Sequence, residues 1–233
     1  MAGDSVQGLA AKGILALKAL PLLLAASMVQ AEHLELGRFS SGELDGWKQQ
    51  EFAGLTRYRL VRDGENRVLE ATSEGTASAW YLKRKIDLRR TPILNWSWQK
   101  VQPVEAGDEA QRAGDDFVAR LYVVKDGGVL FWRTIAINYV WSNHFSKGDA
   151  WDNPFAGRNA RMLSLRDAGA PSDEWFAESR DVQEDFLRLH GEQVDSIDGI
   201  AIMTDTDNSP AELGIARYGD IFFSSRQSGP GSK

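Results

Sequence analysis

Two adjacent carboxylates, Asp115 and Asp116, precede Arg120 near the middle of the 233-residue chain. Side chains alternate along a β-strand, so Asp116 and Arg120 lie on the same face if this segment is extended. A carboxylate and a guanidinium on one polar face can bind sugar hydroxyls or a substrate carboxylate through charge-assisted hydrogen bonds. More often, such residues form a cross-strand ion pair or finish a loop turn. Asp115, Asp116 and Arg120 are therefore candidate ligand-binding residues with a structural alternative.

A second group combines polar side chains with tryptophan on two predicted strands: Asn95, Ser97, Arg133 and Asn138 with Trp96, Trp98, Trp132 and Trp141. Saccharide recognition requires hydrogen-bonding partners for hydroxyls and a flat apolar surface for the sugar ring. Strand alternation places Arg133 on the face of Tyr139 and Trp141. It places Asn138 on the other face, with Trp132. One of these sets must be core, as we expect for most of the tryptophans. Arg133 and Asn138 are kept as candidate ligand-binding residues.

Residues 143–160 have no regular hydrophobic period. Loops longer than about 12–15 residues in compact domains are usually functional or disordered. Three aromatic residues, Phe145, Trp151 and Phe155, together with His144, make this composition atypical of disorder. We expect the loop either to cover a sheet face or to form one wall of a binding cleft. Trp151 is its candidate ligand-binding residue.

The sequence Asp205-Thr206-Asp207-Asn208 places two carboxylates and an amide oxygen within four residues. Such hard oxygen ligands can hold Ca²⁺, so Asp205, Asp207 and Asn208 are candidate ligands for a structural calcium ion. An EF-hand is excluded because its glycine and its distant glutamate are missing. A turn in which Asp and Asn bond to their own backbone uses the same residues without a metal, and we favour that interpretation. No other cofactor is expected.

Several reaction types lack their sequence motifs. The chain has no G-x-S-x-G nucleophile elbow, no H-E-x-x-H zinc motif, no P-loop and no dinucleotide-binding glycine fingerprint. Three scattered histidines and the absence of cysteine give zinc little support. The formal charge of −6 and the pI near 5.2 provide no basic field for phosphate groups. Nucleic acid and anionic membrane surfaces are therefore unexpected partners.

The elements that must position these residues are mostly β-strands. After residue 34, apolar and polar residues alternate with a period of two, which predicts half-buried antiparallel strands. In one of them, over residues 116–124, Asp116, Arg120 and Tyr122 share a side. The predicted strands cover residues 57–62, 67–72, 79–88, 93–101, 116–124, 129–141, 161–165, 174–179, 197–204 and 215–224.

One helix is indicated between Asp181 and Gly191. Asp181 can cap its N-terminus, Glu184 occupies the third helical position of a capping box, and Gly191 ends it. About ten strands, one short helix, no repeat and no linker predict a single all-β domain over residues 32–226, an antiparallel β-sandwich. Residues 227–233 should form a flexible tail.

The first 31 residues have the features of an export signal. Lys12 and Lys18 supply positive charge ahead of an apolar run at residues 19–29, which is too short to span a bilayer. Val29-Gln30-Ala31 offers small residues at the −3 and −1 positions of a signal-peptidase site, which predicts cleavage before Glu32. A proline inside the run argues against a buried N-terminal helix. We expect a periplasmic or secreted protein with no membrane insertion after cleavage.

Four spaced segments resemble a known bacterial family. They are Gly114-Asp115-Asp116-Phe117 with Arg120-Leu121-Tyr122-Val123-Val124, then Ile137-Asn138-Tyr139-Val140-Trp141-Ser142, Met203-Thr204-Asp205-Thr206-Asp207-Asn208 and Tyr218-Gly219-Asp220-Ile221. In this order they resemble domain-of-unknown-function family 3047, which is typically exported from Gram-negative cells. The resemblance implies a jelly-roll β-sandwich similar to carbohydrate-binding modules. It implies no activity, because none is established for the family.

These observations predict an exported, non-enzymatic jelly-roll domain that binds a glycan or another polar envelope ligand on a sheet face or at a loop edge. Two alternatives stay open. The chain could be a polysaccharide-acting enzyme whose acids, from Asp115, Asp116 and Asp205 or Asp207, face each other across a cleft. It could instead be a structural partner in a cell-envelope complex, with an exposed apolar patch. The oligomeric state is not predicted.

Overall fold

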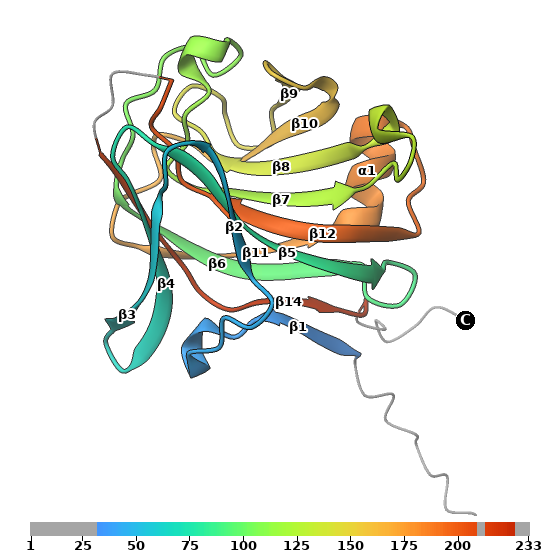
Figure 1. The fold of residues 1–233 in the computed structure, drawn as a ribbon, viewed down its shortest axis with the longest axis horizontal. Helices are drawn as coiled ribbons and strands as arrows, with labels where there is room; N and C mark the ends of the chain where they lie inside the picture. The colour runs from blue at the N-terminus through green and yellow to red at the C-terminus, as the bar shows by residue number, and fades with distance from the viewer. Residues whose placement is uncertain (1–31, 209–212, 227–233) are drawn as a thin grey trace, which may run out of the picture. The chain divides into compact units, whose positions relative to one another are not determined.

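The computed structural model describes residues 32–208 and 213–226, which form two seven-stranded sheets (Figure 1). The first sheet has the order β1 (His33–Gly37), β14 (Ile221–Ser224), β6 (Ile93–Gln102), β13 (Gly214–Tyr218), β4 (Asn66–Ser73) and β3 (Arg57–Asp63), with β11 (Trp175–Asp181) also paired to β6. The second sheet has the order β2 (Lys48–Ala53), β5 (Ala77–Asp87), β12 (Ser196–Met203), β7 (Arg120–Lys125), β8 (Ile135–Trp141), β10 (Gly157–Arg166) and β9 (Ala150–Asn153). The predicted signal at residues 1–31 and tail at 227–233 lie outside the described residues.

The prediction of an all-β jelly-roll sandwich with one short helix is confirmed. Strand pairing in the described residues is antiparallel with one exception, because β8 and β10 run parallel and place Asn138 opposite Met162. The chain leaves β8, passes through β9 and turns back into β10, so β10 recovers the direction of β8. This connection builds the end of the second sheet from the segment that we expected to be an irregular loop.

The core lies between the two sheets and is rich in aromatic residues. Leu94, Trp96 and Trp98 project from β6 into it, as strand alternation predicts. Trp96 lies 5.5 Å from Tyr139 of β8, and Trp98 lies 6.0 Å from Trp141, measured between ring centroids. These contacts join the first sheet to the second, so the large rings of β6 and β8 hold the two layers in register.

The predicted helix is α1 (Val182–His190). The Asp181 side chain accepts a hydrogen bond from the Glu184 backbone N–H at 3.1 Å, and Gly191 ends the helix with φ of 71°. Val182 and Phe186 are buried against the sandwich, which fixes the helix beside β8, β10 and β11. No helix in the described part of the chain is long and apolar enough to cross a membrane.

Two predicted strands begin later than expected. The strand predicted over residues 116–124 starts at Arg120. Residues 116–119 are buried on all sides, so their sequence does not have the alternation of one buried and one exposed face that marks a strand. The strand over residues 129–141 starts at Ile135, after a turn in which the Leu130 N–H bonds to the Gly127 carbonyl and a 3₁₀ helix, η3 (Phe131–Arg133). The expected shared face of Arg133, Tyr139 and Trp141 was therefore wrong, and Arg133 is exposed.

Other boundaries also differ. Residues 143–160 contain β9 and the start of β10 rather than a single loop. The strand predicted over residues 215–224 is two strands, β13 and β14, which are separated at Gly219, where the backbone N–H bonds to the Ser97 carbonyl. Sequence patterning did not predict β1 or β2, because their residues are mostly exposed or half-buried and carry little hydrophobic alternation.

Candidate functional site

The outer face of the second sheet carries a trough of small residues. Ala201 on β12 lies opposite Tyr81 of β5 on one side and opposite Tyr122 of β7 on the other. Two strand spacings separate the tyrosine backbones, which is about 9–10 Å. Two residues before Ala201, Gly199 lies opposite Lys83 of β5 on one side and Val124 of β7 on the other. At these positions β12 thus forms a floor of small residues, and Tyr81 of β5 and Tyr122 of β7 form aromatic walls on either side.

This trough forms a groove of about 490 Å³. Its polar and aromatic lining comes from β2, β5, β7 and β12 and from single residues next to β7 and β8: Gln50, Phe52, Tyr81, Lys83, Tyr122, Asp126, Thr134 and Asp198. That volume falls in the range of small-ligand sites in proteins, which combine apolar walls with a few polar groups. The groove is therefore a candidate ligand site.

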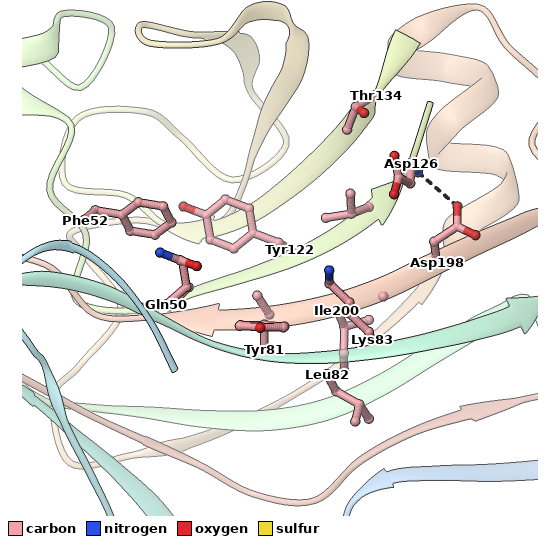
Figure 2. A pocket seen from close by; sticks show the side chains of 14 residues that line it. Gln50, Phe52, Tyr81, Leu82, Lys83, Tyr122, Asp126, Thr134, Asp198 and Ile200 are labelled. Atoms are coloured by element: carbon pink, nitrogen blue, oxygen red, sulfur yellow. Dashed lines mark hydrogen bonds between the residues drawn. The ribbon is translucent and has the colours of Figure 1, made fainter. Parts of the chain in front are cut away.

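The two ends of the groove differ in chemistry (Figure 2). Figure 2 draws Phe52 and Tyr122 at one end, and Phe52 is 65% exposed. At the other end lie Thr134, Asp126 and Asp198. The Asp198 carboxylate accepts hydrogen bonds from the Asp126 N–H at 2.9 Å and the Lys125 Nζ at 3.1 Å. The groove therefore has an aromatic end and a charged end.

Arg120 is the centre of a buried carboxylate cluster at the start of β7, with only 2% of its side chain exposed. Its Nε donates to Asp205 Oδ1 at 2.9 Å and its Nη2 donates to Asp205 Oδ2, which makes a bidentate pair. Its Nη1 donates to Asp115 Oδ2 at 3.3 Å, and its guanidinium lies 4.3 Å from the Phe117 ring centroid. Arg120 is ion-paired as predicted, but through Asp205 and Asp115 rather than Asp116.

Asp116 and Asp207 add two further carboxylates to this cluster. Asp116 is fully buried, and both of its oxygens accept from the Asn208 backbone N–H at 3.1 Å. Oxygen atoms of Asp116, Asp205 and Asp207 lie within 4.8 Å of one another. Burial raises the pKa of Asp205 well above its ordinary value, and burial also raises the pKa of Asp115 and Asp207. One guanidinium does not balance four carboxylates, so a bound proton or cation would relieve the repulsion.

A hydrogen bond connects the carboxylate cluster to the groove. The Arg120 Nη1 donates to the Tyr122 hydroxyl at 3.2 Å, and that hydroxyl lies 3.5 Å from the Met203 sulfur. Tyr122 therefore has one end held by a buried cation while its ring forms a groove wall. The predicted candidates Asp115, Asp116 and Arg120 thus do not line the groove, but they lie directly behind one of its walls.

The remaining predicted site residues lie elsewhere. Asn138 is fully buried, opposite Tyr122 in the β7–β8 register. The Trp151 ring stacks on Phe145 at 3.9 Å and is 9% exposed, so residues 143–160 cover part of the sheet instead of forming a groove wall. Arg133 is exposed on η3. None of the three lines the groove.

Sequence reasoning missed most of the groove residues. Tyr122 was the available signal, since alternation already placed it on the face of Arg120. Tyr81 and Lys83 also alternate along one strand, but the sequence does not show that β12 lies between β5 and β7. Phe52 lies in a strand with no regular alternation. The groove depends on strand order, which is a property of the whole fold.

Comparison with known families gives a match over residues 45–222 to the model described as "Protein of unknown function (DUF3047)". The chain belongs to this family. No curated protein matches the chain significantly. The family membership agrees with the resemblance in the four sequence segments, two of which contain the residues of the carboxylate cluster.

Solved structures with a similar fold share little sequence with this DUF3047 chain. The family 11 carbohydrate-binding module of the Clostridium thermocellum cellulase Lic26A-Cel5E is 10% identical, with a TM-score of 0.44, over 88% of this chain and all of that one. The xyloglucanase domain of NopAA from Sinorhizobium fredii is 11% identical, with a TM-score of 0.37, over 79% of this chain and 96% of that one. No function is transferred at such low identities and scores.

The carboxylate cluster of the DUF3047 chain changes the ligand set that we predicted for calcium. Asp205 and Asp207 do approach each other, and Asp116 joins them. Asp205 has both oxygens bound to Arg120, which leaves Asp116 and Asp207 as the better ligands. Asn208 donates its backbone N–H to Asp116. Carboxylate oxygens suit Ca²⁺, so a structural calcium ion with this altered ligand set stays the alternative to the metal-free turn.

Replacement of Arg120 by Ala should lower the free energy of unfolding by about 3–5 kcal/mol, because it leaves Asp205 and Asp115 buried without their cation. Urea unfolding followed by tryptophan fluorescence measures the change. Arg38→Ala is the matched control, since Arg38 and its partner Glu43 are each about half exposed and their pair contributes little. Equal effects of the two substitutions would contradict the role of Arg120.

Calcium in the carboxylate cluster should raise the melting temperature of the protein, and EDTA should reverse the rise, because the ion binds the folded state selectively. Asp207→Asn should abolish the response by removing one ligand charge. Mg²⁺ at the same concentration controls for ionic strength. Melting curves that do not change with calcium or EDTA would remove the metal prediction and leave protonation as the way the cluster is neutralised.

Proposed function

We propose that this domain binds a neutral saccharide chain in the groove on the outer face of the second sheet. The observation that carries the proposal is the trough floored by Ala201 and walled by Tyr81 and Tyr122. Aromatic side chains pack against the C–H groups of sugar rings, and adjacent polar groups bond to the hydroxyls. The trough supplies both, with Gln50 and Thr134 among its polar residues.

The shape of the site supports a chain rather than a single sugar. The groove follows β5 from Ala79 to Lys83, a length of about 13 Å for four strand steps. It lies on an open sheet face, so a polymer can continue past either end. The formal charge of −6 on the chain would repel a polyanion, which favours a neutral saccharide over an acidic one.

Binding without catalysis is part of this proposal. An enzyme that cleaves glycosidic bonds needs two carboxylates on either side of the bond, about 5–10 Å apart. Asp115, Asp116, Asp205 and Asp207 gather instead in one cluster behind Tyr122, and none lines the groove. Of the two carboxylates that do line it, Asp126 and Asp198 (Figure 2), Asp198 is already bonded to the Lys125 Nζ and the Asp126 backbone N–H. This arrangement supports a binding site and gives no support to the alternative of a polysaccharide-acting enzyme.

Phe52→Ala should weaken saccharide binding about tenfold, because it removes an exposed ring at the aromatic end of the groove without disturbing the core. Screening on an array of neutral glycans identifies the ligand, and calorimetry on the best hit gives the affinity. Phe155→Ala is the matched control, since Phe155 is 51% exposed and lies outside the groove. The proposal fails if no neutral glycan binds, or if both substitutions have the same effect.

Export is the second part of the proposal and rests on the sequence of residues 1–31 alone. Cell fractionation followed by intact-mass measurement should find a periplasmic or secreted form that begins at Glu32. The cleaved form would lack the positive residues Lys12 and Lys18 and would meet glycans of the cell envelope or the surroundings. Recovery of the uncleaved chain in the cytoplasmic fraction would contradict this localisation.

A further inference from the structure

A second groove, of about 390 Å³, lies on the outer face of the first sheet. Ser97 of β6 forms part of it, and strand alternation turns Ser97 away from the core that contains Trp96 and Trp98. We infer that this groove is a separate site for a neutral, hydroxyl-rich saccharide. It shares the ligand class of the proposed function, but none of its residues belongs to the first groove.

The walls of this second groove are fixed by side-chain hydrogen bonds between distant parts of the chain. On one side, the Trp175 Nε1 donates to Asp63 Oδ2 at 2.7 Å. On the other side, the Ser40 backbone N–H and hydroxyl donate to the two Asp220 oxygens at 2.8 and 2.5 Å. Both carboxylates are thereby oriented before a ligand arrives, which lowers the entropy cost of binding.

The floor of the groove depends on a glycine. The Gly219 N–H donates to the Ser97 carbonyl at 2.9 Å, and a Cβ atom at position 219 would lie 2.2 Å from the Ser97 hydroxyl oxygen. Only glycine lets the turn between β13 and β14 pass this close to Ser97 while the hydroxyl keeps its place in the lining. The close approach therefore brings a serine hydroxyl and the turn backbone together at the base of the groove.

Three lining side chains have hydrogen-bonding capacity that no described residue uses. Arg67, Asn66 and Ser97 line the groove, and none of their side chains forms a hydrogen bond or an ion pair within the described part of the chain. Arg67 and Ser97 offer donors to hydroxyl oxygens, and Asn66 offers both a donor and an acceptor. These groups are therefore free to bind a ligand.

Charge and shape in the second groove select the ligand class. Among the described residues, Arg67 is the one cation that lines it, and Asp63 and Asp220 are its two carboxylates. Asp63 is also paired with Arg217 at 3.3 Å, so the charges around the groove nearly balance, which favours a neutral ligand. Carboxylates and a guanidinium bond well to sugar hydroxyls, which act as both donors and acceptors. The half-buried Trp175 ring supplies the flat surface against which a sugar ring packs.

Two sites on opposite outer faces would make the domain bivalent. A single domain could then join two glycan chains, or hold one chain and a branch of another, with an avidity above that of either site. The first groove contains no tryptophan, whereas the second contains Trp175, so the two sites can be followed separately in one protein.

The test is a nuclear magnetic resonance titration of the ¹⁵N-labelled mature domain with cellohexaose, laminarihexaose, maltohexaose and chitohexaose. The Trp175 indole resonance is assigned with Trp175→Phe and should shift saturably with at least one hexaose. Arg67→Ala should raise the dissociation constant at this resonance at least tenfold. Arg62→Ala is the matched control, because Arg62 faces Arg67 across the hairpin and does not line the groove.

Tyr122→Ala separates this inference from the proposed function. The Trp175 shift should persist in that variant, because Tyr122 belongs only to the first groove. A Trp175 resonance that moves with none of the four hexaoses overturns the second site, whether or not the first groove binds. An equal loss of affinity in Arg67→Ala and Arg62→Ala overturns it as well. A Trp175 shift without any Tyr122-dependent binding supports the second site and contradicts the first.

Discussion

The burial of one arginine constrains much of the second sheet. Arg120 is enclosed at the start of β7 and cannot lose its charge, so the chain must supply partners around it. Asp205, from the segment after β12, and Asp115, from the segment before β7, provide them. The same guanidinium holds the Tyr122 hydroxyl at 3.2 Å. The position of the segment before β7, the position of the segment after β12 and one wall of the groove thus depend on a single buried cation.

The groove itself follows from what the central strand lacks. β12 is flanked on its outer face by Tyr81 and Tyr122, and its own residue at that level is Ala201. A large side chain there would fill the space between the rings and produce a flat apolar face. Gly199 is required for a different reason, because a Cβ atom would lie 2.7 Å from the Leu82 carbonyl oxygen. Two separate requirements therefore favour small residues on β12: Gly199 is needed for close packing against β5, and Ala201 keeps the trough open.

Sequence reasoning succeeded where a residue's role is set by its near neighbours. The alternation of Leu94, Trp96 and Trp98 identified the core face of β6, and Asp181 and Gly191 identified both ends of α1. It failed where the role depends on chain segments far away. The main partner of Arg120 lies 85 residues along the chain, and four consecutive buried residues before β7 show no strand period. The groove could not be predicted because the sequence does not reveal that β12 separates β5 from β7.

Differences between the two grooves argue for different kinds of recognition. The first has aromatic walls and a floor of Ala201 and Gly199, whose side chains cannot reach a ligand to distinguish one hydroxyl from another. Its affinity should come mainly from ring packing, which tolerates many neutral sugars, and its selectivity from the few polar side chains of the lining, such as Gln50 and Thr134. The second has a polar base and polar walls, with orientations fixed by Asp63 and Asp220. Fixed polar groups penalise a ligand whose hydroxyls do not match them, so the second groove should discriminate among sugars more strongly than the first.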